Sequence, residues 1–183
     1  MFFKFIDWQT CIKIFSFEKY LLLLIYKTAL ELEGRTVYQR SAFREMAPNV
    51  TDCLTSIHYI FKKALSIDIP ITYVGDMPRN LFFSSNWKAL KINIEDALCG
   101  DILFVKNKER IKLLSHAALI LGNNQFFHCS PILNTAAIQS KDDFFSFYEQ
   151  KLNLIKMLHY IDPRNKEMRE KNQGIFIVDE ISI

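Results

Sequence analysis

Three side chains in this sequence are of the types that thiol catalysis requires: Cys53, His116 and His128. Cys53 follows Thr51-Asp52, residue types that commonly cap a helix N-terminus, and it precedes apolar residues at helical spacing. We therefore place Cys53 in the first turn of a helix, where unpaired backbone N–H groups and the helix dipole favour a thiolate. The alternative is a small, inert core residue, which is the commoner use of cysteine.

The two histidines stand on either side of a hairpin signal, Gly122-Asn123-Asn124. A three-residue loop here places His128 opposite Ala118, and His116, two residues before Ala118, shares its face of the sheet. The two histidines then become diagonal neighbours, roughly 5.5–8 Å apart. A two-residue loop would put them on opposite faces, so the prediction depends on the turn.

This set of side chains has a direct chemical interpretation. One imidazole accepts the thiol proton, and the second fixes the tautomer of the first and stabilises the imidazolium. The backbone N–H of Cys53 is a candidate donor to an oxyanion. Each histidine could instead be a hydrogen-bonded boundary residue. Cys53, His116, His128 and Cys129 also have the ligand types of a zinc site, but Cys129 follows His128 in a strand and should point to the other face. We therefore expect no metal and no cofactor.

Length and composition limit the class of protein. A chain of 183 residues is long enough for one domain with its own core, and a hydrophobic content of 50% excludes disorder. The net charge of +3 is spread along the chain, which does not favour a nucleic-acid partner. The four cysteines are far apart and lack a CxxC spacing, as expected for free thiols in a reducing compartment.

The first residues do not form a recognisable cleavable signal. The apolar run over residues 21–26 is too short to span a bilayer. We expect no integral membrane segment, and a cytoplasmic location.

The elements that must position the three side chains are helices first and strands later. This order predicts an α+β fold in one domain over residues 17–183, preceded by an arm over residues 1–16. His58 is expected on the exposed side of its helix. We expect helices over 17–33, 53–65 and 141–151, a loop over 35–48, a helical turn near 87–90, and strands near 101–105, 117–121, 125–129, 135–138, 154–160 and 174–181.

Four stretches together resemble the NlpC-like cell-wall peptidases, and the resemblance covers roughly residues 22–161. These are papain-fold cysteine peptidases that cut bacterial peptidoglycan stem peptides, commonly between D-glutamate and the diamino acid. The resemblance implies a papain-like (NlpC-type) fold with N-terminal helices packed on a central antiparallel sheet. The stretches are Asp52-Cys53, Gly100-Asp101-Ile102-Leu103-Phe104, Ser115-His116-Ala117-Ala118-Leu119-Ile120-Leu121-Gly122-Asn123 and Phe127-His128.

The resemblance also assigns roles. Cys53 would be the nucleophile, His116 the base and His128 the third member of a Cys-His-His triad. Tyr38, Asp52 and Ser115 would bind substrate, with the Asp52 carboxylate holding a free amine. The implied partners are peptidoglycan-derived peptides, and the family suggests the periplasm or cell envelope as the alternative location.

The sequence departs from the family pattern near the expected site. Leu54 and Thr55 stand where Ser and Gly usually follow the Asp-Cys pair, and Gln39-Arg40-Ser41 replaces the usual glycine pair after the tyrosine. Two alternatives therefore stay open: acyl transfer or deamidation of another substrate on the same fold, and an inactive binding protein.

Overall fold

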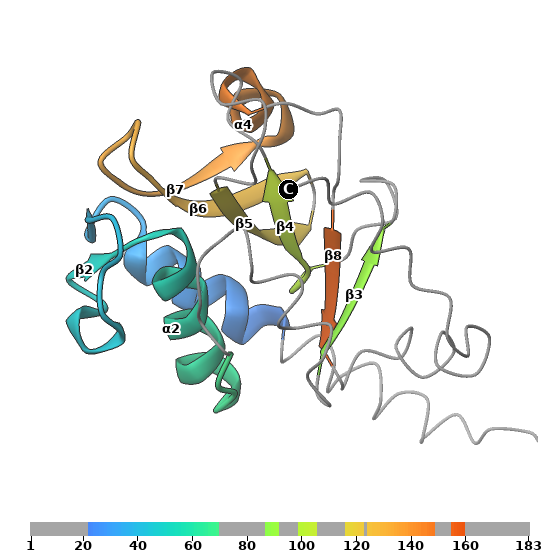
Figure 1. The fold of residues 1–183 in the computed structure, drawn as a ribbon, viewed down its shortest axis with the longest axis horizontal. Helices are drawn as coiled ribbons and strands as arrows, with labels where there is room; N and C mark the ends of the chain where they lie inside the picture. Colours follow the sequence, from blue (N-terminus) through green and yellow to red (C-terminus); the bar gives the residue numbers. More distant parts are fainter. Residues whose placement is uncertain are drawn as a thin grey trace, which may run out of the picture.

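The computed structural model describes residues 22–69, 99–105, 116–122 and 124–148 with their side chains, and the backbone of residues 87–91 and 155–159. These residues form one sheet with helices on both of its faces (Figure 1). Three expectations lie outside the described residues: the arm over residues 1–16, the surroundings of Ser115 and the strand near 174–181.

The sheet has eight strands in the order β2-β1-β7-β6-β5-β4-β8-β3. Its neighbouring strands are antiparallel, as expected, except for the short parallel pair of β1 and β2 at one edge. The strands are β1 (Val37–Tyr38), β2 (Val50–Thr51), β3 (Trp87–Lys91), β4 (Ile102–Val105), β5 (His116–Gly122), β6 (Gln125–Ser130), β7 (Thr135–Ser140) and β8 (Ile155–His159).

The two faces of the sheet bury different helices, because side chains of a strand alternate between the faces. In β5, Ala117 and Leu119 pack with α2 (Cys53–Leu65) and with the helical segment over residues 22–32. Ala118 and Ile120 point the other way and pack with α4 (Lys141–Phe147). Figure 1 shows α2 and α4 on opposite sides of the sheet. The central strands are therefore buried on both sides.

The start of α2 follows from its first residues. Asp52 is the N-cap: its Oδ1 accepts hydrogen bonds from the backbone N–H groups of Leu54 (2.9 Å) and Thr55 (2.8 Å). The Thr55 hydroxyl in turn accepts from the Asp52 N–H at 2.7 Å, which completes a reciprocal capping box. The predicted position of Cys53 in the first turn is confirmed.

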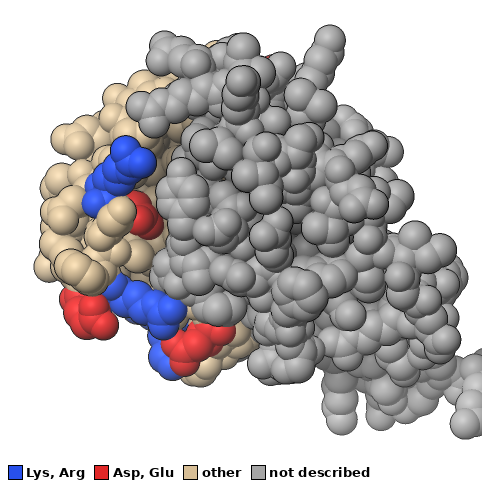
Figure 2. Space-filling model, in the orientation of Figure 1, with Lys and Arg blue, Asp and Glu red and all other residues tan. Residues whose placement is uncertain are grey.

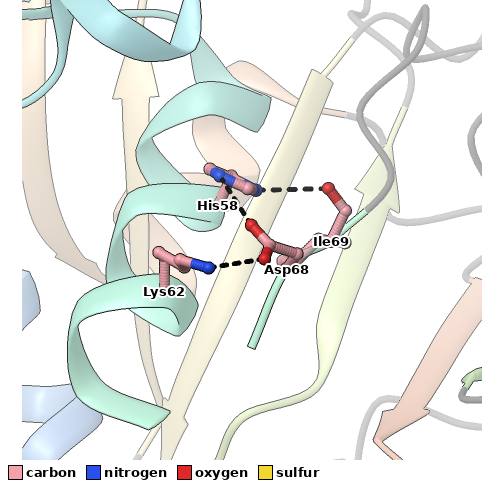
Figure 3. Close-up of polar contacts among 4 residues, drawn as sticks. All are labelled: His58, Lys62, Asp68 and Ile69. Carbon is pink, nitrogen blue, oxygen red and sulfur yellow. Dashed lines mark hydrogen bonds and ion pairs between the residues drawn. The ribbon is translucent and has the colours of Figure 1, made fainter. Parts of the chain in front are cut away.

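The chain that follows α2 folds back against the helix (Figure 3). α2 ends at Leu65, as expected. Beyond it, the Ile69 carbonyl oxygen lies 3.2 Å from His58 Nδ1, and the Asp68 carboxylate contacts both His58 Nε2, at 3.7 Å, and Lys62. His58 is only 7% exposed, so its expected place on the exposed side is wrong. A contact to a later loop is not visible in the apolar periodicity of the helix.

The β5–β6 hairpin brings the two histidines to one face by a route that differs from the expected one. Leu119 pairs with Phe127, a register that places His128 opposite Ala118, as predicted. Gly122, however, is still paired with β6, so the loop has two residues rather than three. A register shift between Ile120 and Gly122 inserts one extra residue into β5 and so restores the expected facing.

Three other expectations about secondary structure need correction. Residues 87–91 form β3, not a helical turn, because β8 pairs with them. The segment expected as a loop over 35–48 contains β1 and a short 3₁₀ helix, η1 (Arg44–Met46). α4 ends at Phe147, well before residue 151, since Tyr148 is already extended.

The described surface carries charges of both signs close together. On the face drawn in Figure 2, basic and acidic side chains of the described part lie beside one another. Lys63 forms an ion pair with Glu31. Among the described residues, no helix is both long and apolar enough to cross a membrane.

Candidate active site

The centre of the candidate site is a hydrogen-bonded pair of buried histidines. His116 begins β5, and His128 lies in the middle of β6. The Nε2 atom of His116 is 2.8 Å from Nδ1 of His128, and the two rings are nearly perpendicular, with centroids 5.0 Å apart. Both side chains are buried. They share one face of the sheet, as the hairpin analysis predicts, and lie close enough to exchange a proton.

A third polar side chain, Gln139, continues this chain of hydrogen bonds. Its Oε1 lies 2.7 Å from Nε2 of His128. In the β6–β7 ladder His128 pairs with Ala137, so Gln139, two residues on, is a diagonal neighbour on the same face. The sequence analysis missed it because the expected strand stopped at Ile138. The pairing pattern of a second hairpin was the signal that could have found it.

Aromatic side chains at the end of the α4 segment cover the histidine pair. The ring of Tyr148 stacks on His116 with a centroid distance of 4.6 Å and an interplanar angle of 4°. Phe144 meets His128 edge-on at 5.0 Å. Both aromatic residues are fully buried. Their contacts with the imidazoles restrict the orientations of both rings.

Cys53 lies at the start of α2, and its sulfur meets the start of β5. The backbone N–H groups of Ala117, the residue after His116, and of Cys53 itself point to the sulfur and lower its pKa. The first residue of β5 that pairs with β6 is Leu119. The ladder between these two strands therefore does not use the N–H of Ala117. This is how a cysteine on the α2 side reaches the strand that carries His116.

Burial dominates the electrostatics of the site. It raises the pKa of the Cys53 thiol well above the usual value, and the Asp52 carboxylate adds to this. Burial lowers the pKa of His116 far below its ordinary value, and lowers that of His128 to about 4. The resting site therefore holds a neutral thiol and two neutral imidazoles. The thiolate expected from the helix start is not favoured here, because desolvation outweighs the dipole.

Of the three expected substrate-binding residues, two are described. Tyr38 is half-buried beside the core, and burial together with the nearby Cys53 raises its pKa to about 12. Asp52 also lies close enough to affect the pKa values of both Tyr38 and Cys53, but its Oδ1 is occupied by the helix cap. Ser115 lies outside the described residues.

The zinc alternative uses Cys129, and the structure separates this residue from the histidines. Cys129 lies on the α2 face, where its sulfur donates to the Thr51 carbonyl oxygen at 3.6 Å. His128 lies on the other face, against Phe144. The predicted opposite orientation of Cys129 is thus confirmed. Among the described residues, no three His, Cys, Asp or Glu side chains are arranged to hold a metal ion.

Comparison of the sequence with known families gives one assignment. The model of the NlpC/P60 family matches residues 38–152, more than half of the chain. The matched region contains Cys53, His116, His128 and Gln139. No curated protein matches the sequence.

Solved structures share the fold at low sequence identity. NlpC1 from Trichomonas vaginalis aligns with a TM-score of 0.54 at 18% identity, over 76% of this chain and 42% of that one. An NlpC/P60 family protein from Bacillus cereus gives 0.55 at 17%, over 77% and 40%. The peptidoglycan hydrolase RipB from Mycobacterium tuberculosis gives 0.52 at 15%, over 79% and 66%. The chain thus spans less than half the length of the first two. The likeness establishes the papain-like α+β fold.

Proposed function

The chain belongs to the NlpC/P60 family, and on that premise we propose that it is a cysteine peptidase that hydrolyses peptidoglycan-derived peptides. The bond we propose is the amide between γ-D-glutamate and the diamino acid. The observation that carries the proposal is the His116–His128 hydrogen bond at the start of β5, beside the backbone N–H that faces the Cys53 sulfur. RipB, which shares this fold, is a peptidoglycan hydrolase.

The proposed reaction begins with proton transfer. His116 takes the proton of the Cys53 thiol as the sulfur attacks the substrate carbonyl carbon. The C=O double bond opens to an oxyanion, for which the backbone N–H of Cys53 at the start of α2 is a donor. The C=O bond re-forms and the C–N bond breaks as the imidazolium of His116 gives its proton to the leaving amine, and a thioester on Cys53 remains. Water, deprotonated by His116, attacks the thioester; the C–S bond breaks, an acid is released, and His116 returns the proton to the sulfur.

Neutral resting groups suit this sequence of steps. A thiol with a raised pKa and an imidazole with a lowered pKa do not form an ion pair until substrate arrives. Charge then develops only along the reaction path, where His128 stabilises the imidazolium of His116 through their hydrogen bond. Alkylation of Cys53 should therefore depend on His116, and His116→Gln should slow it.

The substrate contacts are part of the proposal. Tyr38 lies near enough to Cys53 for their charges to interact, which suits a side chain that lines the site. The cap of α2 uses only Oδ1 of Asp52, so we assign Oδ2 to the free amine of the peptide. Ser115, which precedes the base, completes the proposed set.

The test is hydrolysis of a synthetic γ-D-glutamyl-diamino acid peptide, followed by mass spectrometry. Cys53→Ala should abolish cleavage and keep the fold. Cys99→Ala is the matched control and should cleave at the wild-type rate, because Cys99 is half-buried and lies beside Gly122, at the end of β5 away from His116. Undiminished cleavage by Cys53→Ala would remove the proposal.

A second candidate is an acyltransferase or deamidase that uses the same three residues. Leu54, which replaces the usual serine after the Asp-Cys pair, favours it, because Leu54 is buried in the first turn of α2 and alters the surroundings of the sulfur. A panel of muropeptides and simple thioester and amide substrates separates the two. Activity on the simple substrates alone supports the second candidate. Inactivity throughout, with Cys53 alkylated no faster than Cys99 or Cys129, indicates a binding protein.

A further inference from the structure

The three proposed catalytic residues do not determine which ring nitrogen of each histidine carries the proton, and Gln139 does. A neutral imidazole carries one N–H, on either Nδ1 or Nε2, and the hydrogen bonds around it select which. His116 and His128 are both buried, so their partners in the protein, and not bulk water, make this selection. The outermost partner in the described chain of bonds is the Gln139 side chain.

The donor and the acceptor in each of these hydrogen bonds follow from the Gln139 oxygen. Oε1 only accepts hydrogen bonds, so Nε2 of His128, at 2.7 Å, must donate to it. Nδ1 of His128 then has a lone pair and accepts from Nε2 of His116 at 2.8 Å. The proton of His116 is therefore on Nε2, and its Nδ1 is unprotonated. That nitrogen is the one able to take the thiol proton.

The opposite arrangement would disable the base. If the partner of His128 Nε2 were a donor, each bond in the chain would reverse. Nε2 of His116 would then accept, and its Nδ1 would carry the proton. A thiol cannot give its proton to a nitrogen that already has one.

We propose that Gln139 is a positioning residue that sets the tautomers of His128 and His116, so that Nδ1 of His116 is free to accept the Cys53 proton. This inference rests on the proposed function for its catalytic consequence. The tautomers themselves are a property of the resting protein. Burial keeps both imidazoles neutral near pH 7, the state in which the choice of tautomer matters.

The fold supports this role with its geometry. Three adjacent strands, β5, β6 and β7, each contribute one member, and successive members are diagonal neighbours on one face. Gln139 is followed by Ser140, the N-cap of α4, whose hydroxyl oxygen accepts from the Asp143 N–H at 3.1 Å. The backbone of Gln139 is thus held between a ladder pair and a capped helix.

Two variants separate the acceptor from the side chain that carries it. Gln139→Glu keeps an oxygen toward His128 and adds a charge, whereas Gln139→Met keeps the length and removes the hydrogen bond. Gln125→Met is the matched control: it makes the same change on the neighbouring strand β6, where the Gln125 side chain faces Tyr26. Thermal unfolding of all three establishes that they fold.

The first readout is ¹⁵N NMR of histidine-labelled protein at pH 7, with the rings assigned by substitution. In the wild type and in Gln125→Met we expect both rings protonated on Nε2 alone. In Gln139→Met we expect a mixture of tautomers for both rings. Nδ1 protonation of either ring in the wild type, or unchanged tautomers in Gln139→Met, would overturn the inference.

The second readout is the rate of Cys53 alkylation by iodoacetamide as a function of pH, which needs no peptide substrate. Gln139→Met should react roughly tenfold more slowly than the wild type near pH 7, within the range that general-base assistance covers. Gln139→Glu should restore the rate near pH 7 and move the acidic limb of the profile to higher pH, because the carboxylate stabilises the imidazolium and so raises the pKa of the base. Equal slowing in both variants would indicate a merely structural side chain and refute the role. A wild type that cleaves no peptide, with the predicted tautomers and alkylation rates, would refute only the proposed peptidase.

Discussion

Acidification should destabilise this protein through His128, and the structure gives the magnitude. Burial lowers the pKa of His128 from 6.5 to about 4, although the hydrogen bond to Gln139 partly opposes this. Between those two pH values the unfolded chain binds a proton at this histidine and the folded chain does not. The contribution of the neutral, buried His128 to the free energy of unfolding is therefore fully present above pH 6.5 and is lost as the pH falls toward 4. At 1.36 kcal/mol per pKa unit, the loss is about 3 kcal/mol.

The assay compares the wild type with His128→Asn, which keeps a polar side chain beside His116 but does not titrate. Urea denaturation at intervals from pH 7.5 to 4 gives the free energy of unfolding of each protein, provided that unfolding is two-state. Carboxylates and the histidines away from this pair titrate in both proteins, so their effects cancel in the difference, and burial alone keeps the pKa of His116 low in both. We expect the wild type to lose about 3 kcal/mol more than the variant over this range. A difference that does not change with pH would refute the assignment of a buried, neutral His128.

Three further perturbations test the supporting structure. Asp52→Ala should lower the free energy of unfolding by about 1 kcal/mol, whereas Asp52→Ser should retain most of the cap; urea denaturation distinguishes them, and equal losses would contradict the capping role. Peptide cleavage that falls equally in both variants would support the proposed contact of the carboxylate with the substrate amine. Tyr148→Ala should cost roughly 3 kcal/mol or more, because it removes the buried ring stacked on His116, whereas Tyr148→Phe keeps the ring and should cost much less; similar unfolding temperatures for the two would count against the stacking. Asp68→Asn should leave the urea midpoint unchanged within error, because Asp68 and Lys62 are both more than half exposed; a large shift would show that its contact with His58 matters more than the structure indicates.

Local sequence was sufficient for the features that depend on neighbouring residues. Asp52 before Cys53 predicts a capped helix start, since the capping bonds join residues two and three apart. The apolar spacing that follows predicts the length of α2, and the alternation of side chains predicts that Cys129 and His128 face opposite ways. The order of helices and strands predicts the α+β class.

The sequence correctly predicts that the two histidines share one face of the sheet, but the expected three-residue loop is not the cause. The sequence signal at Gly122 predicts a hairpin, but not a bulge. A two-residue loop alone would have turned His128 away from His116, and the irregularity before Gly122 compensates for it. The packing of the strands, and not the turn residues, decides whether the hairpin combines a two-residue loop with a bulge.

The tertiary structure alone decided the partners and the charges of the site. Gln139 and Tyr148 reach the histidines only because β7 and the α4 segment fold onto the same face of the sheet. The protonation of Cys53 depended on burial, which no helix-start signal contains: a dipole acts over one turn, whereas desolvation depends on everything packed around the sulfur. Sequence determined which residue types could react, and packing determined their resting charge and the residue that orients them.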